Sequence, residues 1–267
     1  MSSPERFTIR LLAPLIPNGI EPGTMFAVEY DPASQWFAVA ATVVVQYLQD
    51  VGRVTFQAFV RPRDALKRDL VKLGVDVPKA IKDGQLIMDD WYSAAQAGGR
   101  VNSGSTKDVS EWIEGGCVRL NSLKVADLSI SWLKNMKSDE DSSGIPEFDN
   151  ANTVQRPPGS LIVVESLSVL LRFNEEKPFL EWQETRVLPN ERAANRINLA
   201  GYARGLHSES FYKRIEEMHD GLIEVRLMEK DGDVGSYLRV TNLRGQPHDS
   251  RWRRIEVKSN GEATLTT

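Results

Sequence analysis

The sequence predicts an α/β fold, in which a mainly parallel sheet is flanked by helices and followed by an antiparallel β extension at the C-terminal end. Apolar stretches of strand length alternate with helical stretches through residues 24–89, which is the order that builds parallel sheets with right-handed crossovers. A further continuous apolar run, Ser160–Val164, has the composition of a central strand buried on both faces. From residue 222 onward, apolar and polar residues alternate instead, as they do in antiparallel strands.

The predicted elements begin with a strand, a tight turn and a long helix. Residues 1–18 form an N-terminal segment, in which Phe7–Leu15 is either an edge strand or a short docking segment. Thr24–Tyr30 is apolar and rich in strand-forming residues. Asp31–Ala33 has turn chemistry, because proline fixes φ and aspartate bonds back to the backbone. Ser34 is then expected to cap an apolar helix that runs to about Leu48.

The remaining elements follow from the same patterns. A helix is expected between Pro62 and Gly74, because proline starts helices and glycine ends them. Ser208 is expected to cap a helix over Glu209–Met218. Two further helical segments are expected near Val169–Phe173 and Lys177–Val187. The other predicted strands are Val54–Val60, Gln85–Asp89, Arg196–Tyr202, Leu222–Met228, Tyr237–Leu243 and Trp252–Val257.

Length and composition fit one domain over residues 1–267, interrupted by a flexible surface loop at 137–158 that is polar, acidic and rich in Ser, Asn and Pro. The chain has 33 Lys plus Arg against 37 Asp plus Glu, so its net charge of −4 creates no general attraction to nucleic acid or membrane. Cys117 is the only cysteine, which excludes an intrachain disulfide. No signal peptide and no membrane-spanning run is present, so we expect a soluble, cytoplasmic protein.

Several motifs resemble the KaiC-like branch of the RecA superfamily of P-loop ATPases. That family has G-I-P-x-G before its first strand and G-D-P-G-S-G-K-T-T at the turn into its first helix. This chain has Gly19-Ile20-Glu21-Pro22-Gly23, and it keeps Asp31, Pro32 and Ser34 of the turn. Further matches extend the resemblance to about residues 19–265: Leu73-Gly74-Val75-Asp76, Asp90-Trp91-Tyr92, Glu165-Ser166-Leu167, His219-Asp220-Gly221-Leu222 and Asn242-Leu243-Arg244-Gly245. The resemblance implies a RecA-like sheet with a closing β-meander.

The positions that handle phosphate in that family hold other residues here. Tyr30, Ala33 and Gln35 stand where glycines belong, so fewer amides are free to converge on a phosphate. Trp36 replaces the lysine, and Phe37 replaces the hydroxyl that binds magnesium. We therefore interpret the pocket as a nucleotide site refilled with aromatic side chains. This degenerate nucleotide site comprises Tyr30, Asp31, Ala33, Ser34, Gln35, Trp36, Phe37, Glu165 and Ser166.

The catalytic acids implied by the resemblance are also changed. Val60 and Arg61 stand where the family has a catalytic glutamate pair. Glu165 replaces the Walker B aspartate, and two roles remain open for it: structural hydrogen bonding or residual binding of a metal or ligand. In active hexamers of the family, a lysine and an arginine of the meander reach the neighbouring subunit's ATP. Asn242 and Arg244 stand at those positions, so they are the predicted inter-subunit contact; the alternative is that Arg244 forms a salt bridge within its own meander.

The predicted function is that of a pseudo-ATPase, a catalytically inactive KaiC-like protein with a structural or regulatory role in an oligomer. Its predicted partners are further copies of itself or a RecA-family paralogue, and no cofactor or metal is expected. One alternative is a ligand-binding module that uses the reshaped cleft. The other is a nucleic-acid-binding accessory protein, because basic residues cluster around Trp252 and could meet phosphates. The same cluster is also compatible with a solvated strand edge. Its members are Arg244, His248, Arg251, Arg253 and Arg254.

Overall fold

The structure is a computed structural model that describes residues 6–90, 92, 159–172, 175–230 and 232–266. The predicted surface loop at 137–158 and Cys117 lie outside the described residues.

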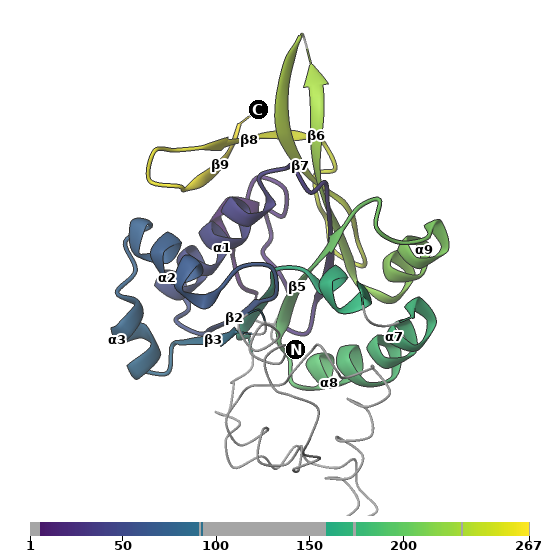
Figure 1. Cartoon of the computed structure of the whole chain (residues 1–267), viewed down its shortest axis with the longest axis horizontal. Coiled ribbons are helices and arrows are strands. Elements are labelled where there is room, and N and C mark those ends of the chain that lie inside the picture. The colour runs from purple at the N-terminus through teal and green to yellow at the C-terminus, as the bar shows by residue number, and fades with distance from the viewer. Residues whose placement is uncertain (1–5, 91, 93–158, 173–174, 231, 267) are drawn as a thin grey trace, which may run out of the picture.

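Nine strands of the described residues form one sheet in the order β3-β2-β4-β5-β1-β6-β7-β8-β9 (Figure 1). Neighbours from β3 to β6 are parallel, and neighbours from β6 to β9 are antiparallel. This arrangement confirms the predicted fold class. The strands are β1 (Met25–Tyr30), β2 (Val54–Ala58), β3 (Leu86–Asp90), β4 (Leu161–Val164), β5 (Ile197–Ala203), β6 (Gly221–Lys230), β7 (Asp233–Leu243), β8 (Arg253–Val257) and β9 (Ala263–Thr266).

Helices cover both faces of the parallel part of the sheet, as the all-buried pattern of β1 requires. Phe26 and Val28 belong to a core that includes residues of α1, α2 and α3, whereas Met25 and Ala27 face a second core with residues of α7, α8 and α9. The helices are α1 (Trp36–Asp50), α2 (Arg63–Lys72), α3 (Val77–Lys82), α7 (Glu176–Trp182), α8 (Leu188–Ala193) and α9 (Glu209–Met218).

The predicted end signals of α2 and α9 are confirmed, whereas that of α1 is not. The hydroxyl of Ser208 accepts a hydrogen bond from the amide of Phe211 at 3.2 Å and caps α9. Pro62 immediately precedes α2, and Gly74 follows it with a φ of +89° that disfavours a side chain. The expectation for Ser34 was wrong, because α1 begins at Trp36 with Gln35 in the N-cap position. Ser34 lies inside the turn, where its amide donates to the carbonyl of Asp31 at 2.8 Å.

The N-terminal segment docks on the domain. Phe7 forms an antiparallel bridge with Ile20, and a 3₁₀ turn follows at Arg10–Leu12. The amide of Leu11 donates to the side chain of Gln46 on α1 at 2.7 Å. Leu12 and its apolar neighbours are buried in the α1 core, so the segment is part of the hydrophobic core.

Some elements exceed the sequence-based expectation. β9 and α3 were not predicted, and β6 and β7 are longer than expected at their shared hairpin. The predicted helix over Lys177–Val187 is α7 followed by a π-helical stretch, Gln183–Val187, which leads into α8. Among the described residues, no helix has both the length and the apolar character needed to cross a bilayer.

His219 is the buried histidine at the end of α9. Its side chain is 2% exposed, its Nδ1 lies 2.8 Å from the carbonyl oxygen of Ile215, and its ring packs edge-on against Tyr202. Burial lowers the pKa of His219 from 6.5 to about 4, because the charged imidazolium would lose its hydration. The folded protein therefore holds this histidine neutral at pH values where an unfolded chain protonates it.

We predict that His219 makes the protein less stable in mild acid. Since the folded pKa lies below the unfolded value, its contribution is fully present above pH 6.5 and is lost as the pH falls towards about 4. The full loss is about 3 kcal/mol of unfolding free energy. Urea unfolding at a series of pH values measures it, and His219→Gln should flatten the profile in that window. Equal profiles for the two proteins would contradict the prediction.

Candidate functional site

The 30–37 turn lies where active sites of α/β proteins form, at the carboxyl end of a central parallel strand. β1 carries it, with β5 on one side and β6 on the other. The amide of Asp31 donates to the carbonyl of Val225 on β6 at 2.9 Å, and the amide of Leu227 donates to the Asp31 carboxylate at 2.9 Å. These bonds hold the turn against the start of the protruding β6–β7 hairpin.

Besides the amide of Asp31, the chain itself uses two further amides of this turn. The Ser34 amide bonds to Asp31, and the Gln35 amide donates to the hydroxyl of Ser236 at 3.1 Å. The hydroxyl of Ser34 is buried without a hydrogen-bond partner among the described residues, whereas Ala33 and Gln35 are exposed. The turn thus presents fewer converging donors than an anion-binding nest needs.

Aromatic side chains fill the space behind the turn. Trp36 is 0% exposed, and its indole Nε1 donates to the main-chain carbonyl of Glu165 at 2.8 Å. Tyr30 stacks on Trp36 with ring centroids 6.0 Å apart, and its edge meets Phe37 at 5.9 Å. Aromatic pairs in these geometries stabilise beyond the area that they bury. Each of the three residues therefore contributes to one continuous cluster.

Tyr30 also links the turn to the end of β4. Its hydroxyl donates to the hydroxyl of Ser166 at 2.8 Å. Burial raises the pKa of Tyr30 to about 12, and the nearby Glu165 carboxylate adds to the rise. The phenol therefore stays neutral at physiological pH and acts as a hydrogen-bond donor.

Glu165 follows β4 and is 0% exposed, with both of its carboxylate oxygens bonded within the chain. One accepts from Nε of Arg61 at 2.6 Å, and the other accepts from the amide of Val60 at 3.2 Å. Arg61 also pairs with Asp69 of α2 at 2.7 Å and lies 4.9 Å from the ring centre of Phe37. A guanidinium group therefore supplies the positive charge at this carboxylate.

Gly201 on β5 leaves the room that this arrangement needs. A Cβ atom placed on it would lie 2.5 Å from the carbonyl oxygen of Glu165 and 3.0 Å from Nε1 of Trp36. Any side chain at this position would separate the two groups that share the indole hydrogen bond. Sequence reasoning missed Gly201, because a glycine inside a strand signals only some close backbone approach.

The structure brings the predicted site residues together but places Arg244 elsewhere. Tyr30, Trp36 and Phe37 meet Glu165 and Ser166 at the carboxyl ends of β1 and β4. Arg244 lies near the opposite end of β1, where its amide bonds to Asp220 and its guanidinium bonds to the carbonyl of Glu217 in α9. Strand rise over the length of β1 separates these two ends by roughly 17 Å. Asn242, on β7, is exposed as well.

The arginine cluster near Trp252 is occupied by acidic partners. Arg251 and Arg253 both pair with Asp249 at 2.8 Å, and Arg254 pairs with Asp233. Arg251 holds the pKa of Asp249 well below its usual range. Pairing reduces the positive charge that this surface offers to a phosphate backbone. Within the described part of the chain, no group of three His, Cys, Asp or Glu side chains has metal-binding geometry.

Pairing between Arg61 and Glu165 was not predicted from the sequence. The sequence indicates an arginine in place of an acid at the end of β2 and an acid at the end of β4. Because β2 and β4 are parallel neighbours, residues just beyond their carboxyl ends lie side by side. This complementary change of charge on adjacent strands was the available signal.

No model of a known protein family matches the sequence, and no curated protein matches it either. Among solved structures, the chain is similar to the KaiC-like protein PH0186 of the hyperthermophilic archaeon Pyrococcus horikoshii OT3. The TM-score is 0.65 and the sequence identity is 15%, over 99% of this chain and 100% of that chain. The likeness shows that this chain has a KaiC-like, RecA-type fold.

We predict that Trp36→Ala destabilises the protein by roughly 3–5 kcal/mol, because it leaves a large cavity and frees the Glu165 carbonyl. Denaturant unfolding measures the loss. Leu206→Ala is the matched control, since Leu206 is 58% exposed and its truncation should change stability by less than about 0.5 kcal/mol. A Trp36→Ala protein of unchanged stability would contradict the structural role of the indole.

We predict that Glu165→Ala destabilises the protein by about 3–5 kcal/mol, because it leaves the Arg61 guanidinium without its buried partner. A double-mutant cycle with Arg61→Ala should show coupling between the two residues. Lys67→Ala is the control: it breaks the exposed pair with Asp64 and should cost less than about 1 kcal/mol. A stabilising effect of Glu165→Ala would contradict this structural role. It would indicate that the protein keeps the buried carboxylate at a cost in stability because the carboxylate binds a ligand.

Proposed function

We propose that this protein is a RecA-type, KaiC-like pseudo-ATPase that acts as a structural or regulatory subunit in a protein assembly. The observation that supports this proposal is the filled site at the ends of β1 and β4. Trp36 and Phe37 occupy the turn where the resembled ATPases hold phosphate and magnesium, and Arg61 neutralises Glu165. Several groups that would stabilise phosphoryl transfer are replaced together, and the loss of each costs a few kcal/mol.

The separation of two surfaces at opposite ends of β1 supports assembly, in place of ATP hydrolysis, as the use of this fold. The 30–37 turn lies at one end and Arg244 at the other, so one chain cannot bring them into contact. Contact between two such different surfaces is heterologous, and heterologous contacts generate rings when the rotation closes. A partner could be another copy or a RecA-type paralogue that retains ATPase activity.

Nucleic-acid binding is less well supported. Three arginines near Trp252 are paired with Asp249 or Asp233, and Arg239 is paired with Glu224 while it stacks on Trp252 at 4.4 Å. An interface for phosphates would need these charges to be free, since affinity depends on the number of phosphates neutralised.

The test measures nucleotide binding and assembly with the same full-length protein. We expect titration calorimetry to detect no ATP binding at about 1 mM nucleotide with magnesium, and we expect no phosphate release. Magnesium-dependent turnover that Glu165→Ala abolishes would overturn the pseudo-ATPase proposal.

Light scattering of the protein, alone and mixed with RecA-type proteins of the same cell, tests the assembly. We expect a complex that Arg244→Glu disrupts, because a reversed charge at a paired contact costs several kcal/mol. Arg68→Glu makes the same charge change on exposed α2 and should leave the complex intact. Melting curves establish that both variants are folded. A protein that stays monomeric with all these relatives would overturn the assembly proposal.

A further inference from the structure

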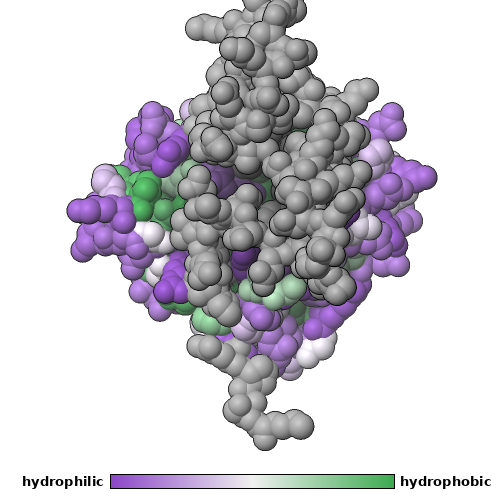
Figure 2. Space-filling view, turned by 90° about the horizontal axis from the view of Figure 1, so that it is seen from below, coloured by the Kyte–Doolittle hydropathy of each residue, from purple (hydrophilic) through white to green (hydrophobic). Residues whose placement is uncertain are grey.

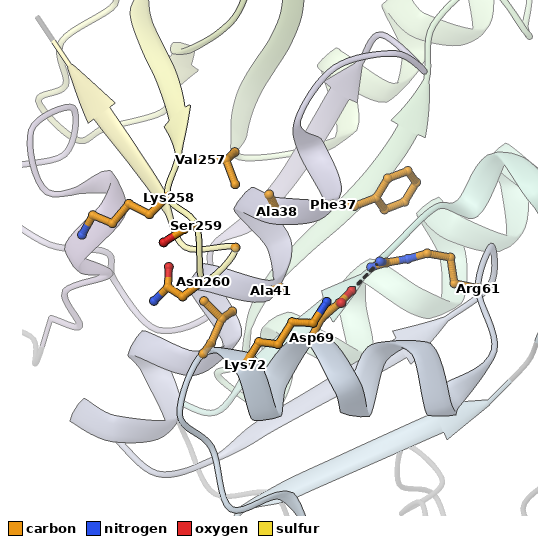
Figure 3. Close-up of a pocket in the computed structure, with 12 residues that line it drawn as sticks. Phe37, Ala38, Ala41, Arg61, Asp69, Lys72, Val257, Lys258, Ser259 and Asn260 are labelled. Atoms are coloured by element: carbon orange, nitrogen blue, oxygen red, sulfur yellow. Dashed lines mark hydrogen bonds and ion pairs between the residues drawn. The ribbon is translucent and has the colours of Figure 1, made fainter.

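The loop that joins β5 to α9, residues 204–208, is held by a small polar cluster outside the filled site. Ser168 lies in the 3₁₀ turn Leu167–Arg172 that follows β4, His207 lies in the loop, and Glu176 lies in the first turn of α7. The loop leads into α9, which lies beside α7 on one face of the sheet (Figure 1). None of these residues lines the cavity of about 310 Å³ between α1, α2 and the β8–β9 turn, which Figure 3 shows.

The hydrogen bonds of this cluster define the protonation of His207. The hydroxyl oxygen of Ser168 accepts a hydrogen bond from the amide of Ala203 at 2.9 Å, and it lies 2.7 Å from Nε2 of His207. Ser168 is 3% exposed, so its own proton needs an acceptor inside the protein, and Nε2 is the acceptor in contact with it. The imidazole is therefore neutral, with Nε2 unprotonated and its proton on Nδ1.

The surroundings of the ring disfavour its charged form. The side chain of His207 is 5% exposed, and its ring packs on Phe211 and Tyr212 of α9, with centroids 4.6 Å and 5.8 Å away. Burial raises the pKa of Tyr212, so this phenol is neutral as well. Burial lowers the pKa of His207 from its usual 6.5, because the imidazolium would lose its hydration.

Glu176 opposes the lowering of the His207 pKa only in part. Its Oε1 lies 3.9 Å from Nδ1 of His207, which is too far for a hydrogen bond. Its carboxylate already accepts hydrogen bonds from the amide and the hydroxyl of Ser208, the N-cap residue of α9. Its side chain is also 34% exposed, so solvent screens its attraction for a charged imidazole.

Ser168, His207 and Glu176 are also the residue types of a catalytic triad, but their geometry does not support nucleophilic catalysis. The base of a triad needs an orienting partner within hydrogen-bond reach, and Glu176 lies beyond it. The oxygen that would attack belongs to a buried residue and already accepts the Ala203 amide. The cluster is better suited to holding the loop.

We propose that His207 is a pH-sensitive latch, which holds the β5–α9 loop against the end of β4 only while its imidazole is neutral. A protonated Nε2 would donate a hydrogen bond instead of accepting one, so the Ser168 hydroxyl would lose the acceptor of its own proton. The buried positive charge adds to this cost. Mild acid therefore favours an open loop, in which the imidazolium is hydrated.

Opening of the loop reaches the filled site through Arg204. The amide of Arg204 donates to the carbonyl of Tyr30 at 2.9 Å, and its guanidinium lies 3.6 Å from the Asp31 carboxylate. Release of the latch therefore loosens the chain beside the 30–37 turn. The latch requires neither assembly nor the absence of ATPase activity, so it succeeds or fails independently of the proposed function.

NMR titration of the full-length protein measures the pKa of His207. We expect a wild-type value below about 6.5. Ser168→Ala removes the donor to the neutral ring and should raise this pKa, whereas Glu176→Gln removes the nearby negative charge and should lower it further. Ser210→Ala is the matched control, because it removes an exposed hydroxyl that contacts Ser208, and it should leave the pKa of His207 unchanged.

Amide exchange at Ala203 and Ser208 measures the opening, because the cluster supplies the acceptors of both amides. Between about pH 7.5 and about pH 5.5 their protection factors should fall about five- to tenfold, as expected if the open loop binds a proton with a pKa near 6.5. His207→Gln keeps a neutral acceptor for Ser168 and should abolish this fall. His219 is present in both proteins, so its effect on global stability cancels in the comparison.

Three results would overturn the latch. One is a pKa of His207 at or above about 6.5, which would mean that Glu176 stabilises the imidazolium in the closed loop. Another is an unchanged pKa of His207 in Ser168→Ala. The third is an equal pH dependence of protection in the wild type and in His207→Gln. If Ser168→Ala does not fold, the wild-type pKa and the comparison with His207→Gln decide.

Discussion

The buried carboxylate of Glu165 is the constraint on which the arrangement at the carboxyl edge of the sheet depends. A fully buried carboxylate needs a counter-charge and hydrogen bonds, because the loss of its hydration costs several kcal/mol. Arg61 and the amide of Val60 supply them from the neighbouring strand end. Arg61 in turn holds Asp69, and through it α2, and it covers Phe37 at the start of α1. The Glu165 carboxylate, through Arg61, thereby links α1 and α2 to the ends of β2 and β4.

The aromatic cluster and Gly201 complete this arrangement on the other side of Glu165. The indole of Trp36 reaches the Glu165 carbonyl only because β5 carries no side chain between them. Tyr30 adds a bond to Ser166, so both residues that follow β4 are held from β1 and α1. These contacts fill space that an ATPase site must leave open for phosphate and metal. The flanks of the molecule seen from below are largely hydrophilic (Figure 2).

The sequence predicted the sheet and most helices because their signals are local. The apolar run at β1, the Ser208 cap and the glycine after α2 each act within a few residues. Short elements such as α3 and β9 gave too few residues for a recognisable period. Ser34 was misassigned because a turn one residue longer has the same composition. The aromatic positions of the site were found from the sequence, but the pairing of Arg61 with Glu165 joins residues 104 positions apart. No local pattern reports a contact of that kind.

The position of β1 in the sheet has a consequence for how the chain reaches its fold. β1 is complete by residue 30, yet its two neighbours are β5 and β6, which begin at residues 197 and 221. During synthesis, the first strand therefore emerges long before either strand that hydrogen-bonds to it. Contacts of such large sequence separation make folding slow, and an apolar strand with two unpaired edges is prone to aggregation in the meantime. The topology therefore leaves β1 without its sheet partners until β5 and β6 have been synthesised.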